Sequence, residues 1–296
     1  MDIKSEAALL FGVDGGGTGT RLMLSAGGHA PPIVEHGGPS ALSLGARAAW
    51  KTLEALCRAA CERAGIDFRW ERCVIAAGMA GAHHVDWKRQ FVELAPPLRA
   101  LRVETDATMT LAGAHGGRPG AIIALGTGSV GESVHADGTR ISVGGYGFPA
   151  GDEASGAWLG LRAARHLQYA FDGRAHPDSL SQALQQRVGV GTREALVEWL
   201  MAATAGDFAR LAPAVVLNAA HPFAYQLLCE AGAELATMAR ALDPGGTLPL
   251  ALCGGLGRAL SAYLPEALRA RLVEPRADAV AGALAIAADI SHEINA

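Results

Sequence analysis

The stretch FGVDGGGTGTRLML, residues 11–24, places an aspartate and a glycine-rich turn between two apolar runs. The runs predict a buried strand over residues 7–14 and a returning strand over 21–26. Glycines lack a Cβ atom and so let backbone N–H groups come close to a phosphate, while threonine hydroxyls add further donors. The stretch therefore predicts either a phosphate-binding turn or an ordinary glycine-rich hairpin turn.

Composition favours a large globular chain. The 296 residues are 50% hydrophobic, and a net charge of −4 comes without any run of basic residues. We therefore expect a substantial core, with no nucleic-acid or membrane partner. The first apolar run is too short for a signal peptide, and later runs fall short of the ~20 residues of a membrane span, so we expect a cytoplasmic protein. Five irregularly spaced cysteines are expected to be small buried side chains of a reducing compartment.

Helix and strand patterns alternate through the first third of the chain. Apolar residues at helical spacing, Ala48 among them, run from Leu44 to Ala64, and Gly65 is expected to end this helix in a left-handed conformation. CVIAAG (73–78) predicts a strand, and a second helix stops before the two prolines at 96–97. LRVET (101–105) predicts the next strand, and Asp106 lies where this strand gives way to a helix.

The opening pattern returns after HGGRPG (115–120). AIIAL, the turn GTGS (126–129) and a returning strand repeat it roughly 110 residues later, which indicates a duplicated domain. The rest is largely helical to about 242, followed by a strand within 249–255 and a last helix at 276–291. We predict an α/β fold of two similar halves with a cleft between them and a boundary within 116–120.

Two common phosphate-binding motifs are excluded. The chain has no GxxxxGK[ST] string, which a P-loop requires. GTGSVG (126–131) matches GxGxxG, but a dinucleotide site places its pyrophosphate on a following helix, and a hairpin pattern follows here. What remains is one Gly/Thr turn in each half, and two such turns can hold a triphosphate from two sides.

Three motifs in order resemble the phosphate-1, phosphate-2 and adenosine motifs of the superfamily that contains sugar kinases, actin and the heat-shock chaperone ATPase. They are DGGGT (14–18), GTGS (126–129) and CGG (253–255). Within that superfamily, GGYGFPAGDEASGAWLG (144–160) is similar to the N-acetylglucosamine and glucosamine kinases, grouped with the BadF/BadG-type ATPases. The resemblance covers essentially the whole chain.

The family fold implies two ribonuclease H-like domains, 1–117 and 118–296, flanking an interdomain cleft. The second domain would carry helical insertions, and its last helix would pack back toward the first domain. Small residues at 78–81 and 281–283 match the connecting segments at the hinge, where ordinary close packing is the alternative interpretation.

The resemblance also implies an ATP- and Mg²⁺-dependent kinase that phosphorylates N-acetylglucosamine or glucosamine at the 6-hydroxyl. Asp14 is then expected to orient Mg²⁺ and Asp106 to act as the catalytic base. The implied nucleotide-binding residues are Gly16, Gly17, Thr18, Thr20, Thr127, Gly128, Ser129, Gly254 and Gly255. The implied sugar-binding residues are Ser40, Asp106, Gly145, Gly147 and Asp152.

Each acid also has a plainer interpretation. Asp14 is suited to start a turn, Asp106 to cap a helix, and Asp152 to complement a helix dipole. Many family members carry an asparagine after the serine of the first sugar segment, and Ala41 stands there in this chain. This departure leaves the identity of the amino sugar open.

Three other functions stay open. A reductase-activating ATPase of the same family needs thiolates for an iron–sulfur cluster, and Cys57 and Cys61 lie within a predicted helix. A sugar-sensing regulator needs a basic helix-turn-helix, which the sequence pattern does not predict. A non-catalytic nucleotide-binding module would not need Asp106. The kinase is the favoured function, and we expect it to be a homodimer.

Overall fold

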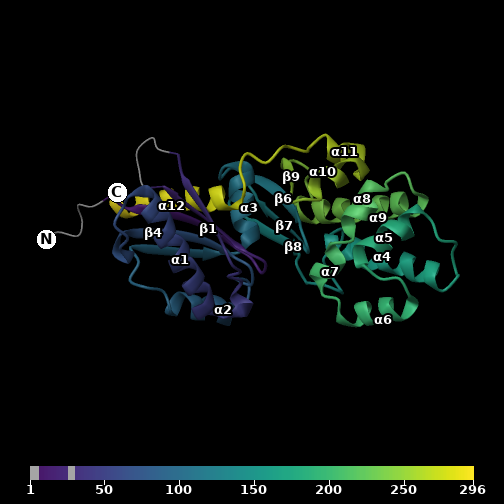
Figure 1. Ribbon diagram of the computed structural model, residues 1–296. Coiled ribbons are helices and arrows are strands. Elements are labelled where there is room, and N and C mark those ends of the chain that lie inside the picture. Colours follow the sequence, from purple (N-terminus) through teal and green to yellow (C-terminus); the bar gives the residue numbers. More distant parts are fainter. Residues whose placement is uncertain (1–6, 26–30) are drawn as a thin grey trace. The chain divides into compact units, whose positions relative to one another are not determined.

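The computed structural model describes residues 7–25 and 31–296 (Figure 1). Residue 26 of the predicted second strand lies outside these ranges. The chain forms two compact units: unit 1 comprises Met1–Arg118 and Pro275–Ala296, and unit 2 comprises Pro119–Glu274. The chain thus leaves unit 1 once and returns to it at the end.

The described part of unit 1 is built on a five-stranded sheet in the order β3-β2-β1-β4-β5. β2 is antiparallel to both of its neighbours, β1 and β3, whereas β4 is parallel to β1 and β5 is parallel to β4. Strands β1, β2 and β4 confirm three predicted strands, and each begins within two residues of its predicted start. The bounds are β1 (Leu9–Gly15), β2 (Thr20–Ser25), β3 (Ile33–Gly37), β4 (Cys73–Met79) and β5 (Ala100–Glu104).

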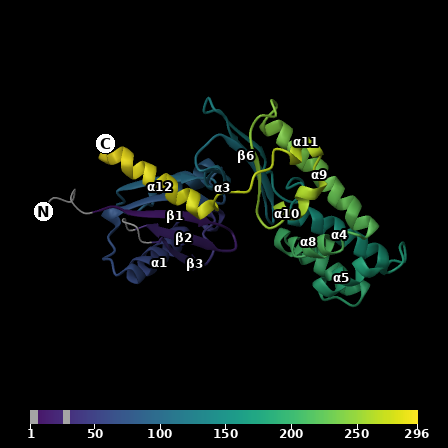
Figure 2. The same ribbon diagram turned by 90° about the horizontal axis from the view of Figure 1, so that it is seen from above.

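Helices cover both faces of this sheet. Phe11 and Val13 of β1 belong to the cluster that packs against α1, while Val74 and Ala76 of β4 face the cluster formed with α12. Figure 2 shows α12 lying along β1, over the face opposite α1. The α-helices are α1 (Ala46–Ala64), α2 (Val85–Glu93), α3 (Asp106–His115) and α12 (Ala279–Asn295), with short 3-10 turns at Leu42–Leu44 and Trp70–Arg72.

Helix α1 ends as predicted, because Gly65 adopts φ 67° and its N–H donates to the carbonyls of Cys61 and Glu62. The prediction that Ala48 lies on its buried stripe is wrong. The helix begins two residues later than predicted, and Ala46 and Ala49 take the buried positions instead.

Close contact between α12 and the sheet depends on Gly12. A Cβ atom there would lie 2.4 Å from the Leu284 nitrogen and 2.5 Å from the Val280 oxygen, both backbone atoms of α12. The helix therefore lies directly on the bare backbone of β1. The predicted start of this helix at 276 is wrong by three residues, because Asp278 caps it and accepts the Ala281 N–H.

Unit 2 repeats the strand pattern. In the described chain its sheet has the order β8-β7-β6-β9, with β6, β7 and β8 antiparallel and β9 parallel to β6. This matches β3-β2-β1-β4 of unit 1 in order and direction, as the repeated sequence pattern predicted. The strands are β6 (Gly120–Leu125), β7 (Ser129–Val134), β8 (Arg140–Gly144) and β9 (Leu250–Cys253).

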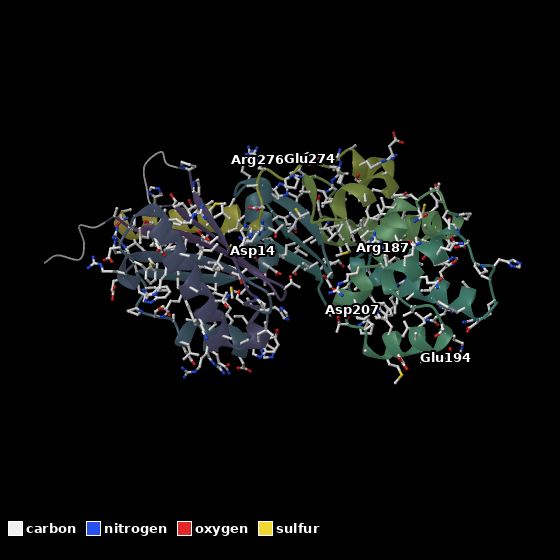
Figure 3. The ribbon with its side chains drawn as sticks, viewed as in Figure 1. Asp14, Arg187, Glu194, Asp207, Glu274 and Arg276 are labelled. Carbon is white, nitrogen blue, oxygen red and sulfur yellow. The ribbon has the colours of Figure 1, made fainter. Side chains whose placement is uncertain are left out.

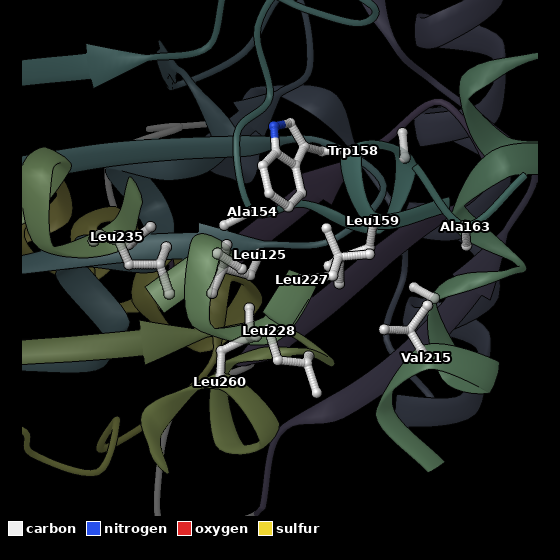
Figure 4. Close-up of a cluster of buried hydrophobic side chains, with 14 of the residues drawn as sticks. Leu125, Ala154, Trp158, Leu159, Ala163, Val215, Leu227, Leu228, Leu235 and Leu260 are labelled. Carbon is white, nitrogen blue, oxygen red and sulfur yellow. The ribbon is translucent and has the colours of Figure 1, made fainter. Parts of the chain in front are cut away.

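A large helical layer covers one face of this second sheet. Leu125 of the sheet packs with Leu159 and with Leu227 in one buried cluster, and Figure 4 shows these side chains together. Helical structure runs to Leu242, as predicted. The helices are α4 (Gly156–Phe171), α5 (Ser179–Val188), α6 (Arg193–Ala202), α7 (Ala205–Ala209), α8 (Ala212–Leu217), α9 (Pro222–Leu242), α10 (Gly257–Leu260) and α11 (Glu266–Arg269), with a 3-10 turn at Ser261–Tyr263.

Candidate active site

Two acids meet at one edge of the unit 1 sheet. Asp14 lies near the carboxyl end of β1, labelled in Figure 3, and is in register with Gly78 of β4. A Cβ atom on Gly78 would lie 3.3 Å from the Asp106 Cα atom, so the start of α3 lies directly against the end of β4. Parallel strands bring their carboxyl ends to one edge, where α/β folds bind ligands. The fold thus brings Asp14 and Asp106 together.

Asp106 is an exposed residue whose carboxyl group is only partly buried, and this partial burial disfavours its charge. Burial raises its pKa above the ordinary value of 3.8, and the negative charge of Asp14 raises it further, while the Ala107 N–H lowers it by donating to Oδ1 at 3.0 Å. The interpretation of Asp106 as the helix N-cap is wrong. Thr105 is the cap and accepts the Thr108 N–H at 3.1 Å, so Asp106 is the first helical residue.

Asp14 forms an ion pair that the sequence analysis missed. Its Oδ2 lies 2.8 Å from Arg21 Nη2 and 3.3 Å from Arg21 Nε, and Arg21 Nη1 lies 2.7 Å from Asp278 Oδ2. Arg21 therefore joins the candidate metal-orienting acid to the cap of α12. The signal was available in the sequence: Arg21 is directly opposite Asp14 in a hairpin whose turn spans four residues.

We call residues 16–19 the unit 1 loop. The Gly16 N–H donates to the Gly19 carbonyl at 2.9 Å, and the Gly16 carbonyl accepts from the backbones of Ser40 and Ala41 at 3.0 and 3.1 Å. A Cβ atom at Gly17 would meet no atom within 4 Å. Backbone hydrogen bonds thus hold the loop on its protein side, and the space at Gly17, next to Thr18, is open.

Thr20 and Ser40 lie behind this loop. Both are almost completely buried, at 2% and 1% exposure, and Thr20 Oγ1 lies 2.7 Å from Ser40 Oγ and from the Gly38 carbonyl. Their hydroxyls are satisfied within the protein. The side chain of Ala41 is buried as well. These three residues support the loop in this structure, and direct ligand contacts by Thr20 and Ser40 stay predictions.

We call residues 126–128 the unit 2 loop. It joins β6 to β7, the turn equivalent to the unit 1 loop, and Ser129 is already the first residue of β7. The Gly126 N–H donates to the Gly128 carbonyl at 2.9 Å, and a Cβ atom at Gly126 would meet no atom within 4 Å. Its outer surface is therefore free to receive a ligand, with the Thr127 backbone held by the N-terminus of α4.

The other predicted residues of unit 2 lie at strand ends. Gly145 and Gly147 follow β8 with φ of 72° and 84°, conformations that favour glycine. Gly254 follows β9 with φ 89°, and a Cβ atom there would lie 2.3 Å from the Leu125 carbonyl oxygen, whereas Gly255 has open space. Asp152 is buried, and its carboxylate lies against the unit 2 loop.

One further group could hold a metal ion. His166, Asp178 and His221 present ligand atoms within 4.8 Å of one another, drawn from α4 and the starts of α5 and α9. Nδ1 of His221, however, accepts the Phe223 N–H at 3.2 Å, so neutral His221 carries its proton on Nε2. That Nε2–H donates to Asp178 at 3.1 Å, and a hydrogen-bonded cluster fits these contacts better than a metal site does.

The cysteines are buried or half-buried, as predicted. Cys57, Cys61, Cys73 and Cys253 are buried, and burial raises the pKa of each thiol. Buried protonated thiols are poor ligands for an exposed iron–sulfur cluster. Among the described helices, none is both long and apolar enough to cross a membrane.

The two units have sheets of one topology, each with a glycine loop between its first two strands, and this arrangement is an α/β fold suited to binding phosphates. The chain belongs to the BadF/BadG/BcrA/BcrD ATPase family, whose model matches residues 11–287. Among curated relatives, the glucosamine kinase GspK of Vibrio cholerae is 28% identical over 288 residues, which cover 96% of this chain and 97% of the relative.

Two solved structures are also similar to this chain. A candidate N-acetylglucosamine kinase from Chromobacterium violaceum is 46% identical with a TM-score of 0.90, covering 95% of this chain and 99% of that one. A ROK-family glucokinase from Streptomyces griseus, solved with glucose and AMPPNP, has a TM-score of 0.53 at 18% identity, covering 97% of this chain and 100% of that one. The second comparison bears on the fold alone.

Proposed function

We propose that this protein is a kinase that transfers the γ-phosphoryl group of ATP to an amino sugar, either glucosamine or N-acetylglucosamine. The observation that carries the proposal is the repeated loop: each sheet has a glycine loop between its first two strands, held on its protein side by hydrogen bonds, with open space at Gly17 and Gly126. Backbone N–H groups in such turns suit phosphate oxygens. The names of the relatives from Vibrio cholerae and Chromobacterium violaceum supply the sugar class.

In this proposal Asp106 is the base. The oxygen of a sugar hydroxyl, which we take to be the 6-hydroxyl, forms a bond to the γ-phosphorus as the bond to the bridging oxygen of ADP breaks. The proton of that hydroxyl passes to the Asp106 carboxylate. Since the transition state is loose, the carboxylate mainly orients the hydroxyl and takes its proton late. A raised pKa suits this role, because it makes the carboxylate a better proton acceptor.

Asp14 fits a magnesium ion. Its side chain is 23% exposed, and Arg21 contacts one of its two oxygens, Oδ2. Hard oxygen ligands of this kind suit Mg²⁺, which supplies charge neutralisation at the phosphates when bound. Arg21 holds the carboxylate in place. A cytoplasmic homodimer belongs to the same proposal.

A coupled assay of ADP release tests the proposal. Glucosamine, N-acetylglucosamine, N-acetylmuramate and glucose are each supplied with Mg·ATP, and the rate is compared with that of ATP and water alone. We expect one of the two proposed amino sugars to give the highest kcat/KM. If no sugar raises ADP release above the rate with water, the kinase assignment is wrong.

A further inference from the structure

The segment that leads into α4, residues 152–157, contacts the whole length of the unit 2 loop. The Gly156 N–H donates to the Gly126 carbonyl at 2.9 Å, and the Ala157 N–H donates to the Thr127 carbonyl at 3.0 Å. The hydroxyl of Ser129, just beyond the loop, donates to the Glu153 carbonyl at 2.7 Å. This segment therefore holds the loop by hydrogen bonds to two of its three carbonyls and to the residue after it.

Asp152 supplies the side chain of this contact. Its Oδ1 accepts the Ser129 N–H at 3.2 Å, inside the protein. A Cβ atom at Gly128 would lie 2.8 Å from Oδ2 and 2.9 Å from Cγ of the same carboxylate. The carboxylate thus lies flat against the loop backbone and requires glycine at 128. At 9% exposure, little of Asp152 faces solvent.

The backbone conformation at Asp152 is unusual. Asp152 and Ala154 adopt φ of 60° and 62°, a region that residues other than glycine rarely occupy. Such conformations cost free energy and persist where surrounding contacts hold them. Here the left-handed turn directs the carboxylate back to Gly128, and the Asp152 carbonyl accepts the Ser155 N–H at 3.1 Å.

We propose that Asp152 is a positioning residue for the nucleotide, which holds the unit 2 loop in the shape that receives phosphates whether or not sugar is bound. The proposal rests on the proposed function, since it takes the loop to be a nucleotide site. It differs from the role of a sugar ligand alone. A carboxylate that contacted only sugar hydroxyls would leave nucleotide affinity without sugar unchanged when replaced.

Calorimetric titration with Mg·AMPPNP and no sugar tests the role of Asp152. Asp152→Gly removes the carboxylate and suits φ 60°, so the backbone is not strained further. We expect its nucleotide affinity to fall about 3- to 10-fold, the size of one hydrogen bond. Asp152→Asn keeps an acceptor oxygen and tolerates this backbone, and should retain most of the affinity. Asp137→Asn, at an exposed turn of the same unit, is the matched control and should bind as the parent does.

A double-mutant cycle with Gly128→Ala makes the test specific. Gly128 does not have a positive φ, and the three atoms nearest to a Cβ atom there all belong to the Asp152 carboxylate. We expect Gly128→Ala to weaken nucleotide binding in the parent and to have a smaller effect in Asp152→Gly, where the nearest three atoms are absent. Unchanged affinity in Asp152→Gly, or additive effects in the cycle, would overturn this proposal alone. Parent protein that bound no nucleotide would overturn the proposed function along with it.

Discussion

Asp106 combines a partly buried carboxyl group with a place at the first residue of a helix that Thr105 caps. In Asp106→Asn we expect kcat to fall by about 10²–10⁴-fold, because the proton acceptor is lost. The melting temperature should not fall, because an asparagine oxygen can still accept the Ala107 N–H. Steady-state kinetics and a thermal melt check both. If kcat stays within about threefold of the parent, Asp106 is not the base.

The pH dependence of the same variant is the companion measurement. Because the pKa of Asp106 is raised by burial, kcat/KM of the parent should fall as the pH drops through that raised value, and the residual activity of Asp106→Asn should lack this decline. The free energy of unfolding depends on pH in the opposite direction: it falls as the pH rises through the raised pKa of Asp106. The folded state holds the Asp106 proton more tightly than the unfolded state, so ionisation at neutral pH lowers the free energy of unfolding. Asparagine should therefore be at least as stable as aspartate at pH 7.

Some site residues could not be assigned from the sequence. The motifs located the two loops, because a Gly/Thr turn after an apolar strand occurs once in each half of the chain. Whether a hydroxyl faces a ligand depends on tertiary contacts: Thr20 and Ser40 satisfy each other only once the chain from residues 20 to 40 has folded back on itself. The direction of the Asp152 carboxylate depends on a left-handed backbone that aspartate rarely adopts.

At the scale of elements, helices α12 and α3 pack closely against each other at glycine residues. A Cβ atom at Gly282 would lie 2.3 Å from the Met109 oxygen and 2.4 Å from the Gly113 nitrogen. Alanine would favour an exposed helix by about 1 kcal/mol over glycine. Here we expect Gly282→Ala to lower the free energy of unfolding by about 1–3 kcal/mol, because backbone atoms must move apart. Urea denaturation of the parent and of Gly282→Ala measures this difference in the free energy of unfolding.

The matched control is Ala285→Ser, at an exposed position of the same helix. It should change the free energy of unfolding by less than about 0.5 kcal/mol. Gly282→Ala that stabilised the protein would show that α12 does not pack on α3 as described.

Periodicity predicted which elements exist better than where they begin. The predicted strands share an apolar run that ends at or near a glycine or an acid. Strand β3 (Ile33–Gly37) was not predicted, because the prolines and glycines around its short apolar part indicate a break in the pattern. The start of α12 was placed too early because residues 276 and 277 are compatible with a helix. In the structure their N–H groups donate instead to the carbonyls of Ala114 and Gly113 at the end of α3. That pairing between segments far apart in the chain has no local signal.

At the scale of the whole molecule, unit 1 depends on the last part of the chain. Helix α12 covers Val74 and Ala76 of β4 and contributes its own buried Val280 and Ala287. A buried valine contributes about 1.5–3 kcal/mol, a large part of the 5–15 kcal/mol that typically stabilises a domain. We expect a chain ending at Glu274 to lose hydrogen-exchange protection throughout β1 and β4.

Unit 2 is the internal control of that experiment. Its helices α4 and α9 pack in a separate buried cluster and should keep their protection. Amides of β1 that stayed as protected as in the full chain would show that α12 is dispensable for unit 1.

The closing of unit 1 by its final helix also bears on the order of synthesis. The ribosome makes β1 before, and α12 after, all of Pro119–Glu274. Unit 2 has its complete sequence before unit 1 does, so it can fold while unit 1 still lacks a face of its core. During translation the apolar face of β1 and β4 therefore remains uncovered until α12 has been made.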